Sequence, residues 1–222
     1  MLDDTTVRSR AIAALMRLAE TKSWREIFLA DIAAEAGLTY AELTAELDSK
    51  AKVLAAFVRA VDQEAAERMA AKPATDSPRD RLFDALMTRF DVLQPYRGAL
   101  KRLVEDAPEL ALAIDPMARL KSMRATLESA RIDATSAIGC LRLAGVGGVY
   151  ARTFKTWLDD DDAGQSRTMA KLDRQLRSGE QAMRTIEDIA GGVGRVLNAF
   201  RSRRRRTETR PEEPAAPPAA NI

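Results

Sequence analysis

The chain has 222 residues, of which 46% are hydrophobic, enough to build a core for one ordinary domain or two small ones. Aromatic residues make up only 5%, and the residues that dominate favour helices over strands, so we expect an all-α protein. There is no histidine, the commonest general base and zinc ligand, and no GxGxxG, P-loop or CxxC motif, so we expect neither an enzyme nor a cofactor or metal.

The first predicted elements form a small helical domain, residues 1–56. Either of two adjacent threonines, Thr5 or Thr6, can cap its first helix. A second helix is predicted over 24–37, where a glycine supplies the left-handed turn that ends it. The next four residues, Thr39 to Glu42, are a capping box that starts a short third helix. Helix, glycine turn and short helix follow one another here.

The segment IAAEAGLT, residues 32–39, followed by Ser49-Lys50, resembles the DNA-binding signature of TetR-family repressors. The resemblance implies a TetR-like fold, with an N-terminal helix-turn-helix and a larger helical domain, and a transcriptional regulator whose third helix reads operator DNA. After the turn, the family signature usually carries glycine, tyrosine and a histidine-phenylalanine pair. This chain departs from it there, with Ala41, Thr44, Glu46 and Leu47. The DNA contacts that we predict are Thr39, Tyr40, Thr44, Lys50 and Lys52.

Charge in this small domain favours an alternative. Residues 1–50 hold six basic and nine acidic side chains, a net charge of −3. Contacts between cations and phosphates supply most non-specific affinity for DNA, so a domain with a net negative charge is poorly suited to bind DNA. The alternative is that the three-helix unit is a scaffold that no longer reads DNA.

The larger domain is predicted over residues 57–200, and a fourth helix is predicted to open at Ser49-Lys50 and to run to about Ala71. Its next helix starts at Ser77-Pro78 and breaks at Gln94-Pro95, and loose helical segments reach Arg131. Methionine-rich apolar walls suit an adaptable ligand pocket, although core packing explains the same residues. The predicted pocket residues are Leu86, Met87, Phe90, Leu103, Met117, Met123, Tyr150 and Phe154.

A long helix predicted over 133–158 carries small residues four positions apart, where another backbone can approach closely. A heptad-like apolar seam follows from Met169 to Phe200, although Gly191, Gly192 and Gly194 weaken its second half. Both features suit a homodimer, as the last two helices form in TetR-family proteins. The predicted interface residues are Ser136, Cys140, Ala144, Gly148, Leu172, Leu176 and Met183.

Four adjacent carboxylates, Asp159 to Asp162, lie between these two features. They lack the spaced oxygen ligands and paired glutamate of a calcium loop. A solvated loop with charge at a helix start is the simpler interpretation.

The C-terminal residues 201–222 are predicted to form a disordered tail, basic and then rich in proline. The segment from Arg195 to Arg210 holds seven arginines and one glutamate, a net charge of +6. Next to an apolar stripe, such a run suits an anionic membrane surface. The lone Cys140 and the absence of a secretory or membrane-spanning apolar run predict a cytoplasmic protein, peripheral at the inner face of the membrane if the tail binds lipid.

Residues 79–103 and 157–176 look similar to the C-terminal domain of a ubiquinone-biosynthesis protein family. This second resemblance implies a TetR-like fold that binds isoprenoid lipid, without DNA, and assists membrane-bound enzymes. The sequence therefore leaves two candidate functions. One is a regulator that responds to a small apolar ligand, and the alternative is a lipid-binding accessory protein.

Overall fold

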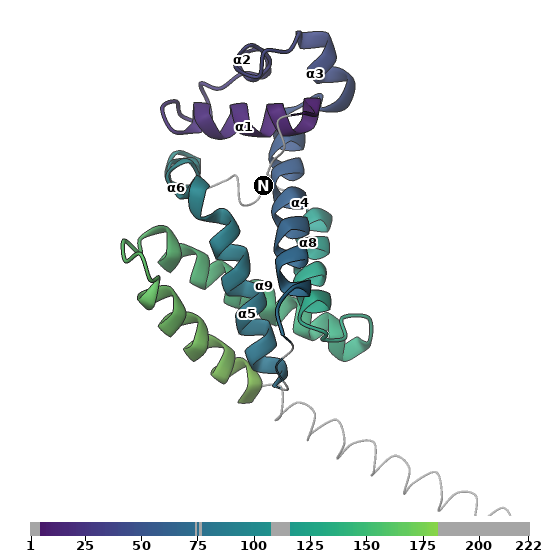
Figure 1. The fold of residues 1–222 in the computed structure, drawn as a ribbon, viewed down its shortest axis with the longest axis vertical. Helices are drawn as coiled ribbons and strands as arrows, with labels where there is room; N and C mark the ends of the chain where they lie inside the picture. Colours follow the sequence, from purple (N-terminus) through teal and green to yellow (C-terminus); the bar gives the residue numbers. More distant parts are fainter. Residues whose placement is uncertain (1–4, 74, 76, 108–115, 182–222) are drawn as a thin grey trace, which may run out of the picture. The chain divides into compact units, whose positions relative to one another are not determined.

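The computed structural model describes residues 5–73, 75, 77–107 and 116–181 (Figure 1). The chain divides into two compact units, residues 1–177 and 178–222, and nearly all described residues belong to the first. Every described element is helical, which confirms the predicted all-α class. Within the described ranges, no helix combines the length and the apolar character that a membrane crossing needs.

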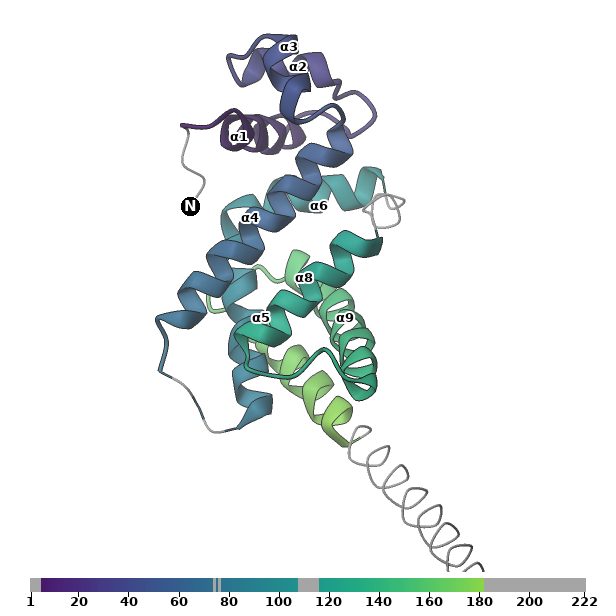
Figure 2. The ribbon, with the colours of Figure 1, turned by 90° about the vertical axis from the view of Figure 1, so that its right-hand side faces the viewer.

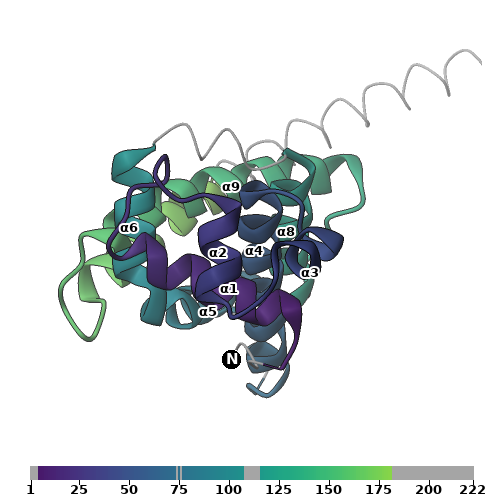
Figure 3. The same cartoon turned by 90° about the horizontal axis from the view of Figure 1, so that it is seen from above.

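Three short helices form the N-terminal part: α1 (Val7–Ala19), α2 (Leu29–Glu35) and α3 (Tyr40–Glu46). They lie together at one end of α4 (Lys50–Ala70), and Figure 3 shows them from above, over the rest of the unit. Thr6 caps α1 in a capping box with Ser9, and Ser49 caps α4. The capping signals predicted from the sequence therefore mark these helix starts correctly.

The larger part contains α5 (Pro78–Leu93), a short 3-10 helix η1 (Gln94–Tyr96), α6 (Arg97–Asp106), α8 (Pro116–Ser129) and α9 (Ala137–Leu158). Residues 166–181 are helical as well. Helix α4 packs against both α5 and α8, so one long helix belongs to the N-terminal part and to the larger part (Figure 2). The segment predicted as loose before Arg131 holds a regular helix, α8.

Two predicted helices begin later than expected. The predicted helix over 24–37 starts only at Leu29, because the Trp24 carbonyl accepts a hydrogen bond from Lys50 Nζ at 2.7 Å and is not part of a helical ladder. The helix predicted over 133–158 starts at Ala137. Asp133 there accepts a hydrogen bond from the Thr135 backbone N–H at 2.9 Å, a local turn that competes with the helix.

The core consists of two apolar clusters. The first holds the buried faces of α1 to α4 and continues into residues of α5, α6 and the end of α9, among them Phe90, Leu103 and Trp157. The second joins α5, α8 and α9 through residues such as Leu86, Leu127 and Val146. The N-terminal and larger parts thus share one cluster across residue 56, and the boundary proposed there stays a prediction.

Candidate nucleic-acid interface

The turn between α2 and α3 is built around Gly37, whose φ of +63° favours glycine. Arg10 from α1 donates through Nε to the Ala36 carbonyl at 3.0 Å and through a terminal nitrogen to the Gly37 carbonyl at 2.7 Å. A Cβ at position 37 would lie 3.0 Å from that arginine. Arg10 therefore holds the turn and sets the angle between α2 and α3.

The start of α3 is held by the predicted capping box. The Glu42 N–H donates to Thr39 Oγ1 at 3.2 Å, and the Thr39 N–H donates to the Glu42 carboxylate at 2.7 Å. Thr39 Oγ1 also donates to that carboxylate at 2.7 Å. The backbone hydrogen bond from Thr39 is the largest reason why the pKa of Glu42 lies below its ordinary value. Glu42 therefore stays negatively charged at neutral pH.

Among the predicted DNA contacts, Tyr40 is exposed, at 57%. Thr44 lies one turn further along α3, and its hydroxyl donates to the Tyr40 carbonyl at 2.9 Å. The structure therefore brings Thr39, Tyr40 and Thr44 together on α3 and its cap, with two of the three hydroxyls used by the helix itself.

Lys50 and Lys52 lie at the start of α4 and have partners of their own. Lys50 Nζ donates to the Trp24 carbonyl and lies 4.5 Å from the centroid of the Trp24 ring. Burial lowers the pKa of Lys50, and the nearby Asp31 carboxylate opposes the shift. Lys52 pairs with Asp48 at 2.6 Å. Lys50 is thus a structural clamp on the loop before α2, which spacing alone did not indicate.

Most cations of the N-terminal part form ion pairs, as Lys52 does, with carboxylates of the same part. These pairs include Arg8 with Glu46 at 3.8 Å, Arg17 with Glu35 at 2.7 Å and Lys22 with Asp31 at 3.5 Å. Exposed pairs of this kind are worth about 0–1 kcal/mol each, so a phosphate can compete for such a cation. Arg8, which was not predicted as a contact, is the cation paired with α3 itself.

Phe28 is a second residue that the sequence did not single out. It lies at the N-cap of α2, its N–H donates to the Asp31 carboxylate at 2.8 Å, and its side chain is 65% exposed. A single exposed apolar side chain is common on protein surfaces, so Phe28 alone does not mark a contact surface. Its sequence signal was weak, because its neighbours Ile27 and Leu29 are apolar as well.

The predicted pocket residues are mostly part of the core. Leu86 and Phe90 are fully buried, Leu103 and Met123 nearly so, and Met87, Tyr150 and Phe154 are partly buried against them. Phe90 stacks on Tyr150 at 5.5 Å between ring centroids. Met117 differs from the others because it is 53% exposed on α8. The structure thus brings seven of the eight residues into the two core clusters, and their role as a ligand lining stays a prediction.

The predicted dimer residues fall into two groups. Cys140 and Ala144 are exposed on α9, Gly148 is half-buried, and Ser136 caps α9 by accepting from the Gly139 N–H at 3.1 Å. Leu172 and Leu176 are 0% and 6% exposed and pack in the second core cluster. Their side chains therefore have little exposed surface with which to contact a partner subunit. Met183, the weakened half of the seam and the basic tail lie outside the described residues.

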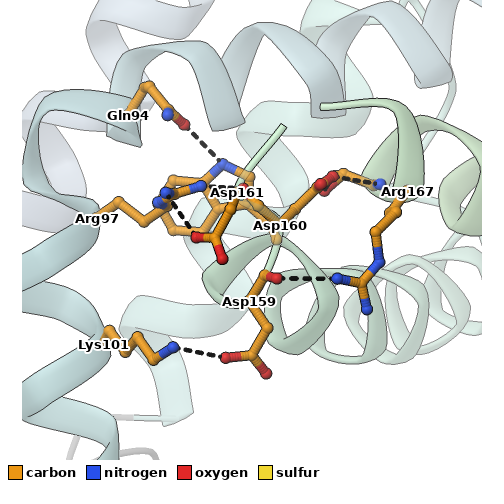
Figure 4. Close-up of polar contacts among 9 residues, drawn as sticks. Gln94, Arg97, Lys101, Asp159, Asp160, Asp161 and Arg167 are labelled. Carbon is orange, nitrogen blue, oxygen red and sulfur yellow. Dashed lines mark hydrogen bonds and ion pairs between the residues drawn. The ribbon is translucent and has the colours of Figure 1, made fainter. Parts of the chain in front are cut away.

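The carboxylates of the loop Asp159–Asp162 have separate partners and do not gather at one point, as Figure 4 shows for Asp159 and Asp161. Asp159 pairs with Lys101 at 2.9 Å and Asp161 with Arg97 at 3.3 Å. The Asp160 carboxylate accepts from the Thr168 N–H at 2.8 Å and so ties the loop to the following helix. Burial raises the pKa of Asp160, but hydrogen bonds from Thr168 and the Asp162 backbone, together with the Arg167 charge, outweigh it, and the pKa lies below its ordinary value.

A search for groups of histidine, cysteine and acidic residues that could hold a metal finds none in the described ranges. Asp159, Asp160 and Asp161 each have a separate partner. The loop acts as a tie between α6, the end of α9 and the helix that follows.

Comparison of the sequence with family models and with curated proteins finds no match. Solved structures do match. A TetR transcriptional regulator from Nitrosomonas europaea ATCC 19718 is 20% identical, with a TM-score of 0.62 over 78% of this chain and 97% of that one. A TetR transcriptional regulator from Rhodococcus sp. RHA1 is 16% identical, with a TM-score of 0.57 over 79% of this chain and 96% of that one.

A tetR-family transcriptional regulator from Streptomyces coelicolor is 18% identical, with a TM-score of 0.54 over 86% of this chain and 88% of that one. The fold is therefore the fold of TetR-type regulators, as the N-terminal signature implied. At these identities, the likeness concerns the fold.

Proposed function

We propose that the protein is a TetR-like transcriptional regulator, a non-enzyme that binds operator DNA as a homodimer and responds to a small ligand. The observation that carries the proposal is the geometry of the N-terminal part. Gly37 and Arg10 hold α2 and α3 in a helix-turn-helix, and α3 presents the exposed Tyr40 at its start. In a helix-turn-helix, the second helix reads base edges in the major groove with its N-terminal residues.

The electrostatics of α3 define a test of DNA binding. Glu46 forms an ion pair with Arg8. When a DNA phosphate pairs with Arg8 instead, the Glu46 carboxylate lies near that phosphate and repels it. Selection of genomic DNA by the full chain at two salt concentrations should recover a near-palindromic site that survives moderate salt. On that site, Glu46→Gln should raise affinity by about fivefold, because it removes a repulsion worth about 1 kcal/mol.

The control for charge is Glu105→Gln, which removes an exposed carboxylate of α6 far along the chain from α3. It should leave DNA affinity unchanged, and Tyr40→Ala should lower it. Recovery of random sequences at both salt concentrations would contradict the regulator proposal. The sequence would then leave the alternative of a lipid-binding accessory protein of ubiquinone biosynthesis.

For the homodimer, we expect Ala144→Phe on α9 to weaken association by about 1–3 kcal/mol, because overpacking a close helix contact has that cost. Ala144 is exposed within the protomer, so the bulky ring has room in the isolated chain. Sedimentation velocity measures the dimer and urea unfolding the protomer. Ala70→Phe, at an exposed alanine of α4, is the matched control. An unchanged dimer would place the interface elsewhere.

A further inference from the structure

A cleft with a volume of about 500 Å³ lies where α1, α4, the end of α5 and η1 meet. Its floor is apolar: Ile12, Phe57 and Val61 line it and are each no more than 3% exposed. Tyr96 forms a wall, and its ring meets Phe57 edge-on at 5.2 Å between centroids and 80° between planes. The pocket predicted from the sequence shares none of these residues.

The rim of the cleft carries carboxylates. Arg68 pairs with Glu64 at 2.8 Å, so these two charges largely cancel. Arg8 also lines the cleft, and it pairs with Glu46 at 3.8 Å. Glu67 accepts a hydrogen bond from Gln63 at 3.0 Å, and Asp91 accepts one from Gln165 at 3.0 Å. Both donors are neutral amides. Among the residues that the structure describes, neither Glu67 nor Asp91 forms an ion pair, so their negative charge is balanced by no cation at contact distance.

From this combination, we propose that the cleft binds a small amphiphilic cation, an amine or quaternary ammonium group on an aromatic or alicyclic body. A volume of about 500 Å³ lies in the range that holds small organic ligands. The apolar body gains by leaving water on the floor, and an aromatic ring can add edge contacts with Phe57 and Tyr96. The cationic group meets Glu67 and Asp91 at the rim, and a face of Tyr96 attracts cations as well.

The position of the cleft gives such a ligand a route to regulation. Ile12 belongs to α1 of the helix-turn-helix, whereas Tyr96 belongs to the larger part. A ligand that contacts both α1 and η1 binds only when these two elements have one relative position. Binding therefore stabilises that position of the helix-turn-helix. This consequence rests on the proposed function, but binding of the cation does not.

The test uses the full chain without DNA and three compounds with one apolar body: 4-phenylbutylamine, 4-phenylbutan-1-ol and 4-phenylbutyrate. Calorimetric titration at low salt should give an affinity for the amine about tenfold above that for the alcohol, since two exposed charge pairs contribute together about 1.4 kcal/mol. The carboxylate should bind most weakly. The double variant Glu67→Gln with Asp91→Asn should reduce the affinity for the amine to that for the alcohol.

Two further variants locate the binding. Ala60 lines the cleft and is half-buried, so Ala60→Leu should fill the space and weaken all three compounds. Asp106→Asn removes an exposed carboxylate outside the cleft and should change nothing. Equal affinity for the three compounds, or binding that Ala60→Leu leaves intact, overturns the proposal. Because no DNA is present, a failure to find an operator leaves this result untouched.

Discussion

Replacing Trp157 with alanine should lower the free energy of unfolding by about 3–5 kcal/mol, the cost typical of emptying a buried aromatic site. Trp157 is 0% exposed, stacks on Phe90 at 5.6 Å and contacts the Phe154 ring at 5.4 Å between centroids. Its indole N–H donates to the Gln94 side-chain oxygen at 3.1 Å. The alanine variant therefore loses ring contacts and leaves a polar group of η1 without its donor. Urea unfolding monitored by circular dichroism measures the loss.

Trp157→Phe separates the two contributions. Phenylalanine keeps an aromatic ring among Phe90 and Phe154 but removes the N–H, so we expect a smaller loss of about 1–3 kcal/mol. If alanine and phenylalanine destabilise equally, the hydrogen bond to Gln94 matters more than the ring packing. A loss below about 1 kcal/mol for the alanine variant would show that this core tolerates a cavity, contrary to the expectation.

Local signals in the sequence predicted helix starts well. Thr6, Thr39 and Ser77 each cap the helix expected of them, because a cap needs only residues within one turn. Asp133 shows the limit of such signals. The sequence predicts it as the first residue of a helix, but its carboxylate accepts hydrogen bonds from nearby N–H and hydroxyl groups, and α9 begins only at Ala137.

Local signals did not predict contacts between residues that lie far apart along the chain. Lys50 was predicted to touch DNA from its place after Ser49, yet its ammonium group clamps the Trp24 carbonyl, 26 positions earlier. The apolar repeat through Leu172 and Leu176 fits a helix that packs on its own protomer as well as one that packs on a partner. Periodicity shows that a face is apolar, and only the fold shows what covers it.

The cleft between α1 and η1 had no sequence signal either. Its floor residues Ile12, Phe57 and Val61 match ordinary core positions of two helices, and its rim residue Asp91 lies on a third. The space arises because α4 continues past the helix-turn-helix and brings η1 opposite α1. It therefore depends on how the elements pack, which composition and spacing do not encode in a readable form.

A buried ion pair joins α4 to α5 and gives the second large prediction. Arg89 and Asp62 form the pair, with side chains only 5% and 13% exposed. Ser122 Oγ of α8 donates to the same Asp62 oxygen at 2.9 Å, and the Arg89 guanidinium lies 5.1 Å from the centroid of the Tyr150 ring. Within the described residues, the buried Arg89 Nε has no hydrogen-bond partner. The pair is therefore costly to bury and costly to break.

Arg89→Met should lower the free energy of unfolding by about 3–5 kcal/mol, because it leaves the Asp62 carboxylate buried without a cation. The double variant with Asp62→Leu should recover most of this loss, since well-packed apolar groups often replace a buried pair at little cost. Arg59→Met, at an exposed position of α4, is the matched control and should stay within about 0.5 kcal/mol of the parent. Urea unfolding of the parent and the three variants measures these losses. Equal losses of unfolding free energy in the single and double variants would mean that Arg89 acts through packing against Tyr150. Recovery of stability in the double variant would mean that charge compensation holds α4 against α5. Helix α4 is the helix that the larger part shares with the helix-turn-helix.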